Sequence, residues 1–205
     1  ADWRAAHFLR GDHFNESALQ FYDGVLDGVL EGAEKVGHGE PEAVADVLEA
    51  LMLSGLSMLV AGSSSPASGG EHLISHYLDM KSSLYGTPHD LHGAQVGVAT
   101  IYCLDLWEQV LALDPMKLNP HTLAQNQLSS EEIEMIIRHE WGLVADMVLA
   151  QWRAKELNKS ELGAELRCVR DHHAMLAHQV RVELLSAVEV ATAIYEAGGP
   201  TSARE

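Results

Sequence analysis

Apolar residues at intervals of three and four recur along most of the chain, and this spacing is the strongest constraint on its fold. In the segment 15–35, the residues with this spacing are Leu19, Tyr22, Val25, Leu26, Val29 and Leu30. The 205-residue sequence has no alternating β-branched runs and no GxGxxG motif after a strand. The pattern therefore predicts an all-α chain without a visible dinucleotide-binding unit.

Breaks in this pattern set the expected helix positions. Ser129 and the acidic residues after it are typical of a capped helix start. The segment 42–61 is apolar on most sides, which is typical of a central helix. We expect helices over about 15–35, 42–61, 71–83, 94–111, 129–141, 140–157 and 161–197, the last bent near His172 and His173.

Length and charge limit the classes of protein that the chain can belong to. A chain of this length suits one helical domain over residues 1–205. Thirteen basic against thirty acidic residues give a net charge of −17, which disfavours nucleic acid and anionic membranes as partners.

Cysteine usage and hydropathy bear on the compartment. Cys103 and Cys168 lack metal-ligand spacing and are expected to be small buried apolar residues in a reducing cytoplasm. We find no apolar run of bilayer length and no signal sequence, so we expect a soluble, cytoplasmic protein without membrane insertion.

Four of the twelve histidines lie within residues 69–97. His72 and His76 are four positions apart, on one face of a helix, and His92 follows one loop later. Neutral imidazole is the commonest metal ligand in proteins, so these three side chains could share one ion. Half-buried, hydrogen-bonded histidines are the alternative. The first His of the HxxxH pattern is preceded by Glu71 instead of followed by a Glu, which excludes a zinc protease.

The segment "GSSSPASGG", residues 62–70, comes directly before the histidine helix. Its small residues direct backbone amides toward a helix N-terminus, an arrangement that binds anions, although an ordinary connector has the same composition. A metal beside an anion-binding helix start suits a small phosphorylated oxygen substrate.

The stretch "GSSSPASGGEHLISHYLDM", followed by "LHGAQVGVAT", resembles the metal-binding core of the sn-glycerol-1-phosphate dehydrogenases. Their superfamily also holds glycerol dehydrogenase, the iron-containing alcohol dehydrogenases and dehydroquinate synthase. "ADWRAAH" and "SGLSML" match too, and the similarity is densest over 43–100. The resemblance implies the helical C-terminal domain of a longer enzyme, whose N-terminal α/β domain binds NAD(P). A helical domain that exists alone is the competing explanation.

The resemblance also implies roles for individual residues. His72 and His92 correspond to metal ligands, with zinc expected and nickel or iron as alternatives, while the family's third ligand, an Asp, lies upstream of "ADW". His76 corresponds to a catalytic histidine near the substrate. The loop residues Ser65, Ser68 and Gly69 are expected at the substrate, and Ser65 stands where relatives tend to carry Arg.

The resemblance implies reversible hydride transfer between NAD(P)H and dihydroxyacetone phosphate or a related polyol. We expect the parent enzyme to be a homo-oligomer and this chain to be inactive alone. The alternatives are a glycerol dehydrogenase, a dehydroquinate synthase-like lyase, an HD-type metal phosphohydrolase or a noncatalytic helical association module. The HD-type site would combine His72 or His76 with His89, Asp90 and Asp105.

Overall fold

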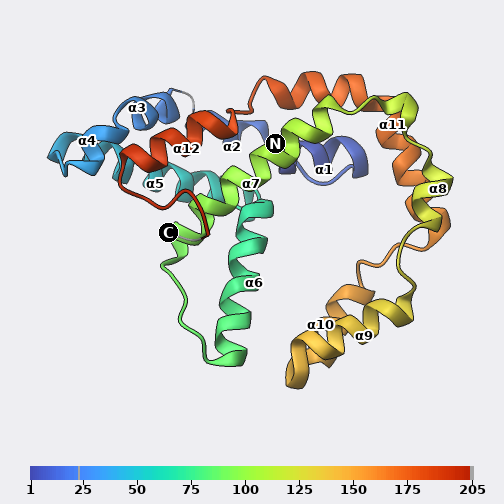
Figure 1. Ribbon diagram of the computed structural model, residues 1–205. Helices are drawn as coiled ribbons and strands as arrows, with labels where there is room; N and C mark the ends of the chain where they lie inside the picture. The colour runs from blue at the N-terminus through green and yellow to red at the C-terminus, as the bar shows by residue number, and fades with distance from the viewer. Residues whose placement is uncertain (23, 204–205) are drawn as a thin grey trace.

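The computed structural model describes residues 1–22 and 24–203, and these residues contain helices and connecting segments but no strand. The all-α prediction is therefore confirmed. Figure 1 colours the helices in chain order, from blue at the N-terminus to red at the C-terminus. They are α1 (Asp2–Arg10), α2 (Glu16–Leu19), η1 (Gln20–Tyr22), α3 (Val25–Glu31), α4 (Ala33–Gly37), α5 (Pro41–Ala61), α6 (Gly70–Tyr85), α7 (His92–Ala112), η2 (Pro115–Lys117), α8 (Pro120–Gln125), α9 (Ser130–Trp141), η3 (Gly142–Val144), α10 (Ala145–Arg153), α11 (Lys159–Arg181) and α12 (Ala187–Glu196).

The expected single helix over 15–35 is wrong, because glycines divide this segment into short helices. Gly24 has a φ of 75°, a left-handed conformation that interrupts a right-handed helix before α3. Gly32 then ends α3 and caps α4. The apolar spacing persists across these breaks, so spacing alone did not locate them.

The expected helix over 161–197 is likewise two helices. α11 continues past His172 and His173 without a break and ends at Arg181. α12 starts after Ser186, whose hydroxyl accepts from the backbone N–H of Glu189, while the Glu189 side chain accepts from the N–H of Ser186. This reciprocal capping box stabilises a helix start and so places the break here.

Among the residues that the structure describes, buried apolar side chains form two separate clusters, each of which joins a few helices. One joins α1, the end of α7 and α11, and is built on Leu111, Leu176 and Val180. The other joins α9 and α10 through Ile137 and Leu149. Neither cluster includes a residue of α3, α4, α5, α6 or α12, which pack through other contacts.

α5 differs most from its prediction. Its small residues Ala43, Ser57 and Ala61 are buried, and the Ser57 hydroxyl donates to the backbone oxygen of Ala18 at 2.7 Å. Its large apolar side chains point outward, with Leu59 76% exposed. The expectation of a central, buried helix is wrong, because α5 packs through the small residues that allow close helix contact.

α5 also overturns the expectation that no apolar run reaches bilayer length. By length and composition alone, its 21 residues could cross a membrane. It is the one helix in the described part of the chain that meets this criterion.

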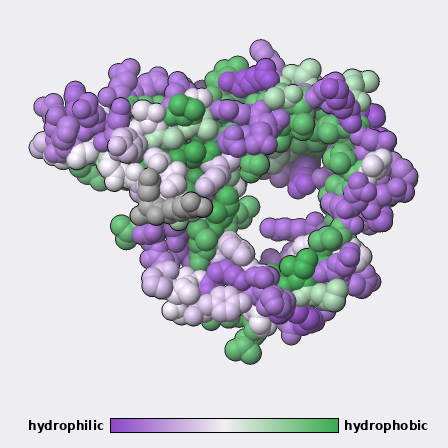
Figure 2. All heavy atoms as spheres, in the orientation of Figure 1, coloured by the Kyte–Doolittle hydropathy of each residue, from purple (hydrophilic) through white to green (hydrophobic). Residues whose placement is uncertain are grey.

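Several of the helices form a ring, and α3 and α4 lie to one side of it in Figure 1. In Figure 1, α6 runs down the view from α7, and α8 and α11 curve away to reach α9 and α10. Contacts between α6 and the end of α9 close the ring. The Lys81 Nζ donates to Glu140. The Tyr77 and Trp141 rings pack edge to face, with their centroids 5.4 Å apart. The space-filling view in Figure 2 shows the opening that this arrangement encloses.

Candidate metal and substrate site

Three imidazoles from α6 and α7 gather at one place. The ring centroids of His72 and His92 are 5.3 Å apart, and His76 lies 6.3 Å from His72 and 6.2 Å from His92. Two of the residues share a face of α6, and the third is the first residue of α7. The structure thus brings together the three histidines that the sequence singled out, with those at 72 and 92 closest to each other.

His72 is oriented by its neighbour in the chain. Its Nδ1 lies 2.8 Å from Oε1 of Glu71, which also accepts from the backbone N–H of Gly69 at 2.7 Å. Because a carboxylate only accepts hydrogen bonds, Nδ1 carries the proton and donates. The Nε2 atom is then the nitrogen through which His72 can bind an ion or a substrate.

His92 is oriented across the helix pair. Its Nδ1 lies 2.9 Å from the hydroxyl of Ser75 on α6, which in turn contacts Gln95 on α7. Both histidines therefore engage a partner through Nδ1. This is the usual arrangement behind a metal-ligating imidazole.

Asp2 holds the start of α6, a role that no local sequence pattern indicates. One carboxylate oxygen accepts from the backbone N–H of Gly70 at 2.7 Å, and the other accepts from the indole of Trp107 at 2.6 Å. The carboxylate thereby joins α1, α6 and α7. Only the tertiary structure could identify it, because its partners lie 68 and 105 positions away.

Cys103 is near the same helix start. A Cβ placed on Gly70 would lie 3.2 Å from its sulfur, so the glycine allows the close approach of α6 and α7. Burial raises the pKa of the Cys103 thiol, and the charges of Glu71 and Asp2 raise it further. Cys103 and Cys168 are both half-buried free thiols, so they are less buried than the sequence analysis predicted.

The amides at the end of the 62–70 loop already have acceptors. The N–H of Gly69 donates to Glu71, and that of Gly70 donates to Asp2. Ser65 is half-buried, and its N–H and hydroxyl contact the hydroxyl of Ser63. Ser68 is half-buried in the same loop. The substrate-binding roles of Ser65, Ser68 and Gly69 stay predictions.

Other histidines lie apart from this group. His89 is exposed, and its Nδ1 contacts the backbone oxygen of Asp90 at 3.0 Å. Asp105 pairs with Gln109 on the surface of α7, thirteen residues beyond His92, which is about 20 Å along a helix. Asp105 therefore lies far along α7 from His89 and Asp90, which precede the helix, so the residues of the HD-type alternative are not gathered at one place. His173 is buried, with its Nε2 at 3.0 Å from the Val110 oxygen, and His172 is exposed beside Phe8.

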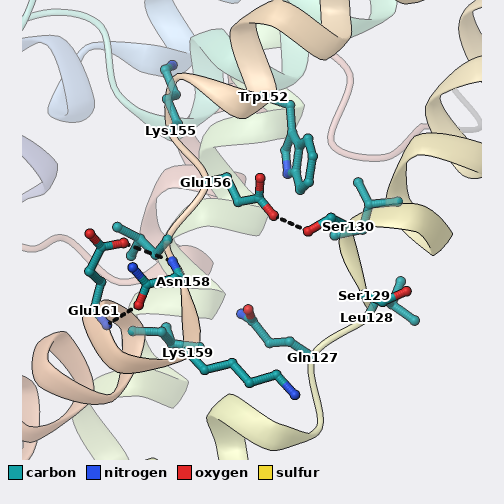
Figure 3. Close-up of a pocket in the computed structure, with 13 residues that line it drawn as sticks. Gln127, Leu128, Ser129, Ser130, Trp152, Lys155, Glu156, Asn158, Lys159 and Glu161 are labelled. Atoms are coloured by element: carbon teal, nitrogen blue, oxygen red, sulfur yellow. Dashed lines mark hydrogen bonds between the residues drawn. The ribbon is translucent and has the colours of Figure 1, made fainter.

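Over residues 1–22 and 24–203, no three His, Cys, Asp or Glu side chains form a group that could hold a metal ion. A cavity of about 840 Å³ lies elsewhere, between the start of α9 and the start of α11. Figure 3 shows its lining, with the Ser130 hydroxyl donating to Glu156 at 2.5 Å and Lys155 and Lys159 nearby. This cavity contains none of the histidines discussed above.

Comparison with known proteins extends the sequence resemblance. A glycerol-1-phosphate dehydrogenase [NAD(P)+] of Bacillus licheniformis is 31% identical over 185 residues, which cover 88% of this chain and 43% of the relative. That of Staphylothermus marinus is 42% identical over 106 residues, or 52% of this chain and 29% of the relative. That of Pyrococcus horikoshii is 45% identical over 100 residues, or 49% of this chain and 28% of the relative.

The chain belongs to the glycerol-1-phosphate dehydrogenase family. No protein-family model matches it. The chain spans less than half the length of these curated relatives. For this glycerol-1-phosphate dehydrogenase family member, the aligned part is an all-α unit that carries the three histidines.

Proposed function

We propose that the chain is the helical, metal-binding part of an NAD(P)-dependent glycerol-1-phosphate dehydrogenase that acts on dihydroxyacetone phosphate or a related polyol. The observation that carries the proposal is the convergence of His72 and His92, whose ring centroids are 5.3 Å apart. The names of the relatives supply the reaction and the cofactor.

The two imidazoles can supply two of the protein ligands of a divalent metal ion. Each engages a hydrogen-bond partner through Nδ1, so each would bind through Nε2. Nitrogen ligands suit zinc, with nickel or iron as alternatives. A metal site requires at least one further protein ligand, and we place it outside this chain. When bound, zinc polarises a carbonyl and stabilises negative charge on its oxygen.

The remaining residues have separate tasks in this proposal. His76 is exposed and stacks with His92 at an interplanar angle of 17°, so its imidazole can donate a proton to the substrate oxygen or accept one. Ser65, Ser68 and Gly69 bind the substrate at the start of α6. Because Ser65 is uncharged, its hydroxyl can hydrogen-bond to a phosphate but cannot neutralise it.

NAD(P) would be bound mainly by a domain outside this chain, since the described residues include no strand to build a strand–turn–helix unit. The chain alone would therefore have no dehydrogenase activity. The complete enzyme would be a cytoplasmic homo-oligomer, a state favoured by the outward apolar side chains of α5.

Zinc binding by the chain tests the metal assignment. We expect competition with a chelator to give a measurable zinc affinity, reduced at least tenfold in His72→Ala and in His92→Ala. His139→Ala serves as the matched control, because its side chain is 86% exposed on α9. Equal affinities in all four proteins would contradict the assignment. Loss of zinc only in His89→Ala would favour the HD-type alternative.

Activity measurements test the reaction. The complete enzyme is expected to oxidise NAD(P)H with dihydroxyacetone phosphate and more slowly with dihydroxyacetone, whereas residues 1–205 alone show no turnover. Preference for unphosphorylated dihydroxyacetone would indicate a glycerol dehydrogenase. A complete protein that neither binds metal nor turns over would indicate a noncatalytic association module.

A further inference from the structure

We infer that Ser75, Gln95 and Asp79 form a hydrogen-bond relay that fixes the tautomer of His92. The relay runs from the Asp79 carboxylate through the Gln95 amide and the Ser75 hydroxyl to Nδ1 of His92. It places the proton on Nδ1 and leaves the lone pair on Nε2. The consequence for metal binding rests on the proposed function, but the tautomer itself does not.

The direction of each hydrogen bond follows from the Asp79 end. A carboxylate only accepts, so the group that faces Asp79 Oδ1 at 3.1 Å must be the NH₂ of Gln95. The same NH₂ also faces the backbone oxygen of Asp90 at 3.4 Å, a second group that only accepts. The amide oxygen of Gln95 is therefore the atom turned toward Ser75.

The Ser75 hydroxyl has one hydrogen, and both Gln95 and His92 are close enough to accept it. Its oxygen lies 2.7 Å from Oε1 of Gln95 and 2.9 Å from Nδ1 of His92. Because Oε1 has no hydrogen, the hydroxyl must donate to it, or two oxygen lone pairs would face each other. The hydroxyl can then only accept from His92, which requires a hydrogen on Nδ1.

Burial makes this order of donors and acceptors costly to reverse. Ser75 is 0% exposed and Gln95 is 8% exposed, both at the contact between α6 and α7. At such positions a polar atom that loses its partner is not readily compensated by bulk solvent. Asp79 sits at the half-exposed end of the relay, 3.5 Å from Nδ1 of His89.

The two proposed ligands thus reach the same tautomer by different routes. His72 donates directly to the adjacent carboxylate of Glu71. His92 is the first residue of α7 and is connected to Asp79 through two buried neutral side chains. Ser75 and Gln95 are therefore positioning residues, since they act on an ion or substrate only through His92.

Nitrogen-15 NMR of the histidine rings in the metal-free chain tests the relay. At alkaline pH, where imidazoles are neutral, we expect the shifts of His92 to identify Nδ1–H as the dominant tautomer. Ser75→Ala and the similarly sized Gln95→Met should shift His92 to a mixture with Nε2–H. Ser83→Ala, an exposed position on the same helix, should leave the tautomer unchanged.

Zinc affinity is the second measurement, and we expect it to fall about 10–100-fold in Ser75→Ala and in Gln95→Met. A dominant Nε2–H tautomer in the wild-type chain would overturn the relay, as would an unchanged tautomer in folded Ser75→Ala and Gln95→Met. If Ser75→Ala does not fold, the wild-type and Gln95→Met spectra decide. A dominant Nδ1–H tautomer without zinc binding would support the relay and count against the proposed function.

Discussion

The indole of Trp107 donates a hydrogen bond of 2.6 Å to the carboxylate of Asp2, 105 positions earlier in the chain. The second carboxylate oxygen accepts from the backbone N–H of Gly70, at the start of α6. One side chain on α1 thereby fixes α6 against α7 within two residues of His72. The position of the histidine helix depends on this long-range contact as well as on its own sequence.

Asp2→Asn should destabilise the chain, because an asparagine amide has one acceptor oxygen and must direct its NH₂ group at one of the two donors. We expect the free energy of unfolding to fall by about 1–3 kcal/mol in urea denaturation. Asp12→Asn, at an exposed position in the connection after α1, serves as the control and should change the free energy of unfolding little. Equal effects at the two positions would show that the Asp2 contacts add no stability.

Leucines on two different helices should differ in how much they contribute to the free energy of unfolding, because one is packed in a core and the other points outward. Leu176 on α11 is 2% exposed, so Leu176→Ala should lower the free energy of unfolding by about 2–5 kcal/mol. Leu59 on α5 is 76% exposed, and Leu59→Ala should change it by less than about 0.5 kcal/mol. Urea denaturation at low protein concentration measures both. A large loss for Leu59→Ala alone would place α5 inside a core.

Asn158 caps the longest helix, α11. Its Oδ1 accepts from the backbone N–H groups of Ser160 and Glu161. Asn158→Ala removes both bonds and should lower the free energy of unfolding by about 1 kcal/mol. Asn126→Ala is the matched control, because Asn126 ends α8 and lies exposed. If both variants lose the same stability in thermal or urea unfolding, the cap has no specific role.

The contact that closes the ring should depend on pH. The hydrogen bond from Lys81 holds the pKa of Glu140 below its ordinary value of 4.5, and the contact from His139 lowers it further. The stabilisation by this ion pair is therefore fully present above pH 4.5 and is lost as the pH falls through the lowered value. At the other extreme, Glu140 raises the pKa of Lys81 above 10.5, so the stabilisation is lost again only at strongly alkaline pH.

The indole N–H resonance of Trp141 can follow this contact by NMR, since its ring packs on Tyr77 beside Lys81. We expect the resonance to move as the pH is lowered from 6.5 to 3, and to be displaced already at pH 6.5 in Lys81→Met. Lys35→Met, at an exposed position on α4, should behave like the wild type. A Trp141 resonance insensitive to both pH and Lys81→Met would mean that the ring is open in solution.

Local features of the chain were predictable because they depend on residues a few positions apart. The apolar spacing identified α5, α6 and α7 to within a few residues, and Ser129 marked the start of α9 correctly. The breaks at Gly24 and before α12 were missed although their signals are local. In both places a continuing apolar pattern was given more weight than a glycine or a capping box.

The sequence by itself determined that the chain is helical and that His72 and His76 share one helix face, because backbone hydrogen bonds and the 3.6-residue turn are set by near neighbours. Only the tertiary structure decided that Ser75 and Gln95 meet beneath His92, that Asp2 holds α6, and that α5 turns its large apolar side chains outward. These contacts depend on how helices dock, and docking is fixed by side chains distant in the sequence. α5 packs closely through the small residues Ala43 and Ser57. Its overall hydropathy did not predict which face would pack.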